Sequence, residues 1–295
     1  MSGLNAALHA HLQTGITSTC RAWALERKDG TIMGFTDHDG ALTFDGITFR
    51  ADTGLSALAI QQSTGLSVDN TEAIGALSDV SIREEDIEAG RYDGAEIRAW
   101  LVNWQDVSQR QLQFRGTIGE LRRSGGAFEA ELRGLTEALN RPLGRVYQKP
   151  CSAVLGDNAC QFQVNTPGYS KELTSVEIID RRVFRFAEFG GFDSGWFQHG
   201  RLIVKSGAAL GLSGLVKRDY IEGAERMIDL WHPLRADVQV DDLLRLEAGC
   251  DKRAVTCRLK FQNLYNFQGF PDIPGDDWSI TDPSRSSGLN GGSRR

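Results

Sequence analysis

The stretch T-C-R-A-W-A-L-E-R-K-D-G-T-I-M-G-F-T, Thr19 to Thr36, has the pattern of two β-strands joined by a tight turn. Apolar and polar residues alternate with a period of two on both sides of Asp29-Gly30. Asp-Gly between two alternating runs is the strongest short-range signal for a β-hairpin. We therefore expect strands over 19–27 and 31–36, and a fold built by antiparallel pairing.

The same kind of pattern continues through the first half of the chain. Asp45-Gly46 separates 41–44 from 47–49, residues 95–104 alternate, and Ser124-Gly125-Gly126 joins 111–121 to 127–133. Residues 4–12 and 80–90 have helical patterns, and 135–139 form a short helical or turn segment. Residues 1–148 are thus predicted to be an N-terminal β domain.

The second half also has many short candidate strands. They are 174–179, 183–186, 196–204, 215–218, 227–231 and 238–246. Strands this short and closely spaced are typical of a small barrel or sandwich. We predict a mainly β (β-rich α+β) protein with two small antiparallel β barrel or sandwich lobes. The second lobe covers 149–247, a closing segment with cysteines and aromatics covers 248–277, and 278–295 are a flexible Gly/Ser-rich tail.

Composition excludes several functional classes. The 295 residues carry a net charge of −6 without a concentrated basic block, which argues against a dedicated nucleic-acid-binding surface. No run of ~18 apolar residues could span a membrane, and no secretory signal is recognisable. We therefore expect a reducing compartment, where disulfides are disfavoured. The hydrolase, zincin, Walker and dinucleotide motifs are absent from the sequence.

Four of the five cysteines form two pairs. Eight residues separate Cys151 from Cys160, six separate Cys250 from Cys257, and 89 lie between the pairs. If the second lobe is compact, its two ends can meet and bring the four thiols together. Cys20 alternates with small apolar residues on a predicted strand, and we expect it to be a plain buried cysteine.

Four interpretations of the paired cysteines stay open on chemistry alone: buried structural thiols, two disulfides, structural zinc, or an iron–sulfur cluster. Zinc sites usually use C-x(2–4)-C spacing, whereas clusters accept more varied spacing. Lys149, Lys252, Arg253 and Arg258 would depress thiol pKa values if they face the sulfurs, or else lie on solvated surface.

Other polar and aromatic groups have simpler interpretations. Asp37-His38-Asp39 is expected to form a turn between strands. Glu84-Glu85-Asp86 and Asp241-Asp242 are expected on solvated faces or in turns, and not as the carboxylate pair of a glycosidase. The aromatic segment of Phe261, Tyr265, Phe267 and Phe270 could be core or a docking strip for a neighbouring subunit.

Four motifs carry a family resemblance. They are G-F-T-D-H-D-G-A-L-T-F-D-G-I-T-F (34–49), G-R-Y-D-G-A-E-I (90–97), A-G-C-D-K-R-A-V-T-C (248–257) and N-F-Q-G-F-P-D-I-P-G (266–275). The chain resembles, from about residue 24 to 275, the tail-tip or baseplate hub proteins of long-tailed phages and alphaproteobacterial gene transfer agents, which are related to tail-tip protein L of phage lambda. The resemblance implies an iron–sulfur cluster of the [4Fe–4S] type. Its ligands would be Cys151, Cys160, Cys250 and Cys257, with structural zinc as the alternative.

The resemblance also implies a structural role without enzymatic activity. A homotrimeric ring would close the sixfold tail tube, because three copies with two β lobes can present six similar surfaces. Its neighbours would be the distal tail protein ring and a tail-tip or fibre-bearing protein, with a tail-associated peptidase as a further candidate. DNA would only pass through the channel. The expected location is the virion tail tip, after assembly in the bacterial cytoplasm. The alternative function is a metal-dependent cell-wall hydrolase or peptidase.

Overall fold

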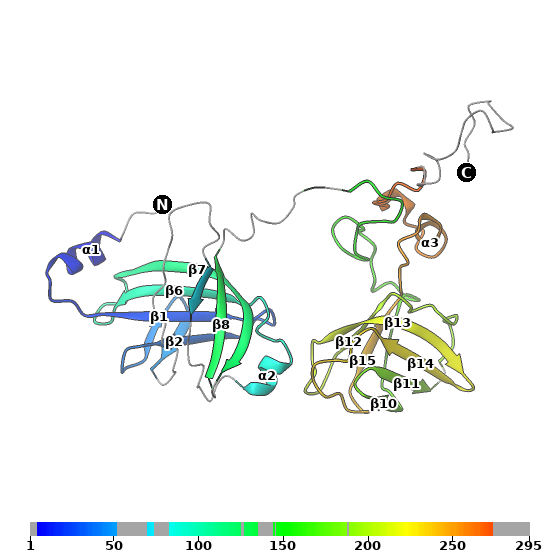
Figure 1. Ribbon diagram of the computed structural model, residues 1–295, viewed down its shortest axis with the longest axis horizontal. Coiled ribbons are helices and arrows are strands. Elements are labelled where there is room, and N and C mark those ends of the chain that lie inside the picture. Colours follow the sequence, from blue (N-terminus) through cyan, green and yellow to red (C-terminus); the bar gives the residue numbers. More distant parts are fainter. Residues whose placement is uncertain are drawn as a thin grey trace, which may run out of the picture. The chain divides into compact units, whose positions relative to one another are not determined.

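The computed structural model describes residues 5–51, 70–73, 83–124, 127–134, 144, 146–187 and 189–273. The chain divides into two compact units, Met1–Leu143 and Gly144–Arg295. Both consist mainly of β-strands (Figure 1), which confirms the predicted class. The predicted helical or turn segment 135–139 and the predicted tail 278–295 lie outside the described residues. None of the described helices is both long and apolar enough to span a membrane.

The first unit contains one large sheet. Its elements are α1 (Ala6–Gln13), β1 (Thr19–Glu26), β2 (Ile32–Thr36), β3 (Leu42–Phe44), β4 (Ile47–Arg50), β5 (Asn70–Ala73), α2 (Glu84–Glu88), β6 (Glu96–Asn103), β7 (Arg110–Ser124) and β8 (Ala127–Gly134). The strand order is β3-β4-β2-β1-β6-β7-β8-β5. The hairpin predicted at Asp29-Gly30 is confirmed, since β1 and β2 pair antiparallel.

One pairing in this sheet departs from the antiparallel prediction. The β3–β4 hairpin forms at Asp45-Gly46 as expected, but β4 then pairs in parallel with β2. The reason is topological: β3 takes the edge and the tight turn brings β4 back beside β2, in the direction of β2. The sheet is therefore mixed.

Strand β1 lies at the centre of the first unit and is buried on both faces. Ala22 and Ala24, both 0% exposed, pack in one apolar cluster with Cys20. Trp23 and Leu25 point to the other face and pack in a second cluster. The buried position of Cys20 confirms the expectation for this residue.

The second unit has one core enclosed by a strongly bent sheet. Its elements are β9 (Ser170–Leu173), β10 (Glu177–Ile179), β11 (Val183–Ala187), β12 (Arg201–Val204), β13 (Ser213–Glu222), β14 (Glu225–Leu230), β15 (Leu244–Glu247), α3 (Ala254–Leu259) and the 3₁₀ turn η2 (Leu264–Asn266). The strand order is β10-β11-β14-β13-β12-β15-β9, with a bulge in β13 between Val216 and Arg218. Inward side chains from both halves of the sheet share one cluster.

Neither sheet closes into a barrel within the described residues. The first sheet ends at β3 and β5, and the second ends at β10 and β9. The barrel form of the prediction is therefore wrong for the described part of the chain, although the two β-rich lobes are present. A closed barrel would require hydrogen bonds between the two end strands, and these strands are not paired with each other.

Three predicted elements differ in length. The strand predicted over 196–204 begins only at Arg201, because His199 has a positive φ of 66° and the preceding residues form a turn. The strand predicted over 238–246 is reduced to β15. Of the helix predicted over 80–90, residues 80–82 lie outside the described residues, and α2 covers only Glu84–Glu88 of the rest. The helix α3, which carries Cys257, was not predicted from the sequence.

Candidate metal centre

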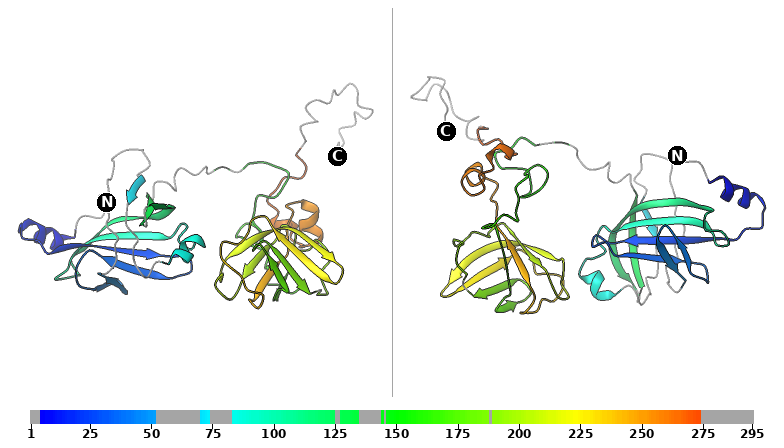
Figure 2. Two further views of the ribbon diagram at one scale, coloured as in Figure 1. Left: turned by 60° about the horizontal axis from the view of Figure 1, so that its bottom comes forward. Right: turned by 180° about the vertical axis from the view of Figure 1, so that it is seen from behind.

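Two chain segments that are far apart in sequence form a separate layer in the second unit. We call residues 146–163 and 249–273 the cysteine cap. In Figures 1 and 2 these segments, green and orange, lie together at one end of the β-strands. The Cys151 N–H donates to the Lys252 carbonyl at 2.8 Å, and the Asn263 amide donates to the Cys160 carbonyl at 2.6 Å. The predicted meeting of the two cysteine-bearing segments is thus observed.

The local structure of the cap places each cysteine. Asp157 organises the first loop, because its carboxylate accepts the N–H groups of Val154 at 2.8 Å and Cys160 at 2.7 Å. Cys250 follows β15 and Gly249, and Cys257 is the buried residue of α3. All five cysteines of the chain are free, so the two-disulfide interpretation does not hold in this structure.

Aromatic rings join the cap to the β lobe. Phe162 contacts Tyr169 with a centroid distance of 4.7 Å and Phe261 with one of 5.0 Å. Tyr169 also lies 6.1 Å from the Trp196 ring, and its hydroxyl donates to the Lys260 carbonyl at 2.7 Å. Phe261 is therefore core, as one of the two interpretations expected, whereas Tyr265 is fully exposed.

The four thiols share one electrostatic environment. Burial, together with the neighbouring Cys250, Cys151 and Cys160, raises the pKa of Cys257 to about 11. Burial also raises the pKa of Cys250, while the backbone N–H and the charge of Lys252 act in the opposite direction. In the metal-free chain, the Cys257 thiol therefore keeps its proton at neutral pH.

Hydrogen-bond donors face two of the sulfurs. The Gln268 N–H lies 3.4 Å from Cys151 Sγ, and Asn263 Nδ2 lies 3.6 Å from Cys160 Sγ. The protonated Cys257 thiol itself donates to the Asn263 carbonyl at 3.3 Å. Donors aimed at sulfur stabilise thiolate charge, and they tune iron–sulfur centres. Asn263 and Gln268 were missed by the sequence analysis, although both follow Cys257 within a dozen residues.

The donor set has the chemistry of a thiolate metal site, although its side chains do not form a ligating group. Within the described residues, no three His, Cys, Asp or Glu side chains are close enough to form a ready metal-binding group. The four cysteines are nevertheless free, lie in one cap and influence one another electrostatically. The residues therefore fit a four-thiolate centre in their chemistry.

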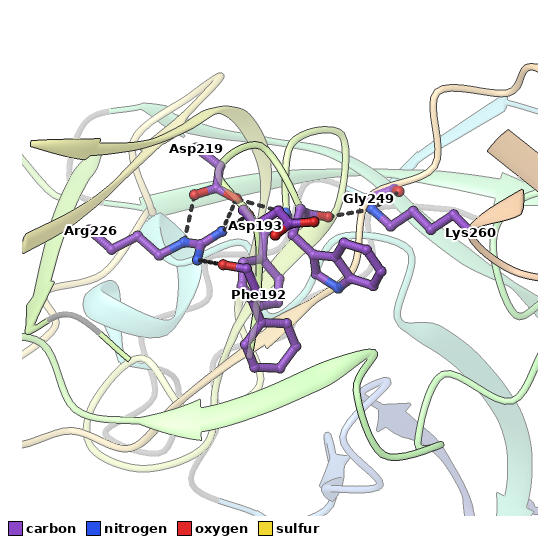
Figure 3. Close-up of polar contacts among 8 residues, drawn as sticks. Phe192, Asp193, Asp219, Arg226, Gly249 and Lys260 are labelled. Carbon is purple, nitrogen blue, oxygen red and sulfur yellow. Dashed lines mark hydrogen bonds and ion pairs between the residues drawn. The ribbon is translucent and has the colours of Figure 1, made fainter. Parts of the chain in front are cut away.

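Two lysines, and not the surface arginines, approach this site. Lys252 Nζ donates to the Ala153 carbonyl and so bridges the two cap segments. Lys260 Nζ donates to the carbonyls of Trp196 at 2.6 Å and Gly249 at 2.9 Å (Figure 3). Arg253, expected either to face the thiols or to lie on solvated surface, is 80% exposed and pairs with Asp251. Lys260 was not predicted.

The remaining candidate groups have local roles. His38 Nδ1 lies within hydrogen-bond distance of the Gly40 N–H, and Asp37 accepts the Arg21 N–H, which confirms the predicted turn. Asp86 is only partly exposed, and it pairs with the buried Arg27 at 3.1 Å. Asp242 is buried and accepts the Gln239 N–H at 2.8 Å, so it stabilises a turn.

A cleft of about 370 Å³ lies in the second unit between the cap and the strands. Its lining includes Glu247, Arg201 and Asp251. Glu247 accepts two hydrogen bonds from Arg201, at 3.0 and 2.8 Å, and Asp251 accepts the Arg253 N–H. Both carboxylates therefore have hydrogen-bond partners within the protein.

Comparisons with known proteins relate both parts of the chain to phage proteins. A family model described as "Baseplate hub protein, N-terminal attachment domain" matches residues 5–163. A second, "Phage conserved hypothetical protein BR0599", matches residues 195–277. A solved chain from the "Virion of native gene transfer agent (GTA) particle" is 52% identical, with a TM-score of 0.91, covering 98% of this chain and 99% of that chain. No curated protein matches.

Proposed function

The chain belongs to the family of phage-type baseplate hub proteins, and we propose that it forms a ring at the tail tip whose second unit is stapled by an iron–sulfur cluster. As a baseplate hub protein, it is a component of a phage-like tail and is located at the tail tip of the particle. The ring, the cluster and the individual partners are the proposed parts.

One observation carries the staple: two segments about 100 residues apart are hydrogen-bonded together, and each contributes two free cysteines. Cys151 and Cys160 come from the first segment, and Cys250 and Cys257 come from the second. When bound, the cluster supplies four iron–sulfur bonds that cross-link the segments. Such a link adds directly to the free energy of folding, because the unfolded chain holds no preformed site.

The chain's own residues prepare this site. Asp157 sets the first loop, and the Gln268 N–H and the Asn263 amide point at sulfur and favour its ionised form. The Cys257 thiol must lose its proton before it can act as a ligand, because burial keeps that thiol neutral. Structural zinc would use the same four thiolates, so elemental analysis must separate the two metals.

Iron, zinc and inorganic sulfide analysis of anaerobically purified protein tests the staple. We expect iron and sulfide in the wild type and their loss in Cys250→Ser. The matched control is Cys20→Ser, which removes a buried thiol of the first unit and keeps the iron. Equal iron in all three proteins, or zinc without sulfide, contradicts the cluster.

We place the exposed side of the cap against a neighbouring chain of the tail. Val255 and Leu259, one turn apart on α3, are 57% and 68% exposed, and Tyr265 is fully exposed. An apolar surface of this kind on a virion component favours burial in an assembly. A homotrimer contacting the distal tail ring and a tail-tip or fibre-bearing protein is the proposed arrangement. Native mass spectrometry should give three chains per ring; a monomer at all concentrations contradicts it.

The proposed ring encloses a channel for DNA and has no catalytic activity. DNA would pass through the ring without being bound, in keeping with the net charge of −6. The alternative, a cell-wall hydrolase or peptidase, requires paired carboxylates or an open metal position. The carboxylates of the cleft described above have structural partners, so no specific observation favours that alternative. Incubation with peptidoglycan should release no fragments.

A further inference from the structure

Lys260 follows α3 directly and is held on the β lobe by contacts of both its backbone and its side chain. Its ammonium donates to the carbonyls of Trp196 and Gly249, and it lies 4.2 Å from the centroid of the Trp196 ring. Its own carbonyl accepts the Tyr169 hydroxyl. The Gly249 carbonyl immediately precedes Cys250, and Lys260 is three residues after Cys257. The Lys260 side chain therefore links the end of α3, close to Cys257, to the backbone just before Cys250.

The carbonyl at Trp196 is fixed by a buried network (Figure 3). Arg226 donates to Asp219 and to the carbonyls of Phe192 and Asp193, and Asp219 also accepts the Phe197 N–H. This network immobilises the loop that presents the Trp196 carbonyl to Lys260. The lysine is thus anchored on a loop that is held by the almost completely buried side chains of Arg226 and Asp219.

The charge of Lys260 has no directly paired carboxylate among the described residues. Its neighbours at hydrogen-bond distance are two neutral carbonyls, and Asp219 is already paired with Arg226. Burial lowers the pKa of Lys260 to about 8, and Cys250 is the largest influence that raises it. A partly buried cation without a partner is costly unless an anion is supplied. Ionised cysteines would supply that anion.

We propose that Lys260 is the positioning residue of the four-cysteine centre: it fixes the Cys250 turn and the end of α3 on the β lobe, and its charge offsets that of the thiolates. This inference rests on the proposed cluster and assigns a role to a residue outside the ligand set. Partners beyond the ligands typically change metal affinity by roughly 10- to 100-fold. A cation beside the centre also favours its reduced state, which carries one more negative charge.

Two variants separate positioning from charge. Lys260→Met removes the donors and the charge, whereas Lys260→Gln keeps a donor for the carbonyls and removes the charge. Lys217→Met is the matched control, because Lys217 also lies over a tryptophan ring, Trp231, at 5.3 Å. The first readout is the rate at which a ferrous chelator removes iron from the purified holoprotein. The second is the reduction potential of the cluster, measured by spectroelectrochemistry.

We expect Lys260→Met to lose iron roughly 10-fold faster than the wild type and to have a more negative reduction potential. Lys260→Gln should lose iron more slowly than Lys260→Met, but its reduction potential should shift to the same extent. Lys217→Met should match the wild type in both measurements. If Lys260→Met does not fold, the potential of Lys260→Gln decides alone. A wild type with iron and variants with unchanged rates and potentials overturns the role of Lys260. A wild type without iron and sulfide overturns the cluster itself and this inference with it.

Discussion

Arg226 and Asp219 form an ion pair in which both side chains are almost completely buried, with exposed fractions of 1% and 0%. The guanidinium donates to the two carboxylate oxygens at 2.7 and 2.6 Å. The two residues lie on neighbouring strands, β13 and β14, and the pair also holds the loop before β12 (Figure 3). The pair is therefore the structural support of the surface on which the cysteine cap rests.

Loss of one partner of this pair should strongly destabilise the second unit. Arg226→Met leaves the Asp219 carboxylate buried without its cation, which typically costs about 3–5 kcal/mol in the free energy of unfolding. Urea denaturation measures the change. Arg181→Met is the control, because its pair with Asp237 is exposed and should contribute less than about 1 kcal/mol. Equal effects of the two substitutions would contradict the structural role of the buried pair.

Gly249→Ala should prevent the cap from packing on the β lobe in its present position. A Cβ at this position would lie 1.6 Å from the Gln198 carbonyl oxygen, so the backbone before Cys250 would have to move. We expect a loss of stability of about 1–3 kcal/mol, together with reduced iron content. Gly190→Ala is the control, since nothing lies within 4 Å of its Cβ position. The measurements are thermal unfolding and iron analysis, and a fully stable, iron-replete Gly249→Ala protein would refute the close approach.

The Cys257 thiol should react slowly with alkylating reagents in the metal-free protein. Only the thiolate is nucleophilic, and burial raises the pKa of this thiol to about 11. Alkylation by iodoacetamide, followed residue by residue with mass spectrometry, should therefore accelerate until about pH 11. A plateau near pH 9, as for an ordinary cysteine, would contradict the raised pKa. Metal uptake should release the proton and become more favourable as the pH rises.

The stability of the metal-free protein should depend on pH through Lys260. Its pKa falls from an ordinary value of 10.5 in the unfolded chain to about 8 when folded, chiefly through burial. Between these values the unfolded chain binds more protons, so the free energy of unfolding rises with pH. The pKa of Cys257 rises from 9.0 in the unfolded chain to about 11 when folded, so between these pH values its ionisation lowers the free energy of unfolding. The free energy of unfolding should therefore rise between about pH 8 and pH 9. Above about pH 9 the effect of Cys257 should offset this rise.

Urea denaturation of Lys260→Met across this range is the measurement. The variant lacks the titrating ammonium, so its stability should be flat between about pH 8 and pH 9 and should then fall as Cys257 ionises preferentially in the unfolded chain. If the wild type and Lys260→Met have parallel pH profiles, the lowered pKa of Lys260 is wrong.

Tyr265→Ser should impair assembly and leave the isolated chain intact. The side chain is fully exposed, so its removal should change the free energy of unfolding by no more than about 0.5 kcal/mol. Native mass spectrometry and the yield of complete tails measure assembly. Ile221→Ser removes a 40% exposed apolar side chain of the strand β13, which is not part of the cap, and is the control. Normal assembly of Tyr265→Ser would remove the cap from the proposed interface.

Much of the fold could be predicted from local sequence. The hairpins at Asp29-Gly30 and Asp45-Gly46 follow from turn chemistry, and the two-residue alternation around them gives the strands within a residue or two. The predicted strand over 196–204 fails where His199 adopts a positive φ, because periodicity does not reveal a turn formed by an ordinary residue. The helix α3 is too short for a helical period to be recognised.

The candidate site could be predicted only in part. Cysteine spacing identified the four candidate ligands, and the two segments that carry them do meet. The sequence left open which neighbouring cations face the thiols. In the structure Arg253 points to solvent, and Lys260, three residues after a cysteine, approaches the site. Which side chain faces a site depends on how α3 packs on the lobe, and charge next to a cysteine in the sequence does not give this.

The sequence by itself determined the β-rich class, the tight turns, the paired cysteines and the family resemblance, because these are written in residues close together along the chain. Only the tertiary structure decided the parallel partner of β2, the open sheets, and the lysine that joins the Cys250 turn to the lobe. These features are contacts between residues up to about 100 positions apart. Their geometry follows from how two surfaces pack, and a local pattern of side chains does not contain it.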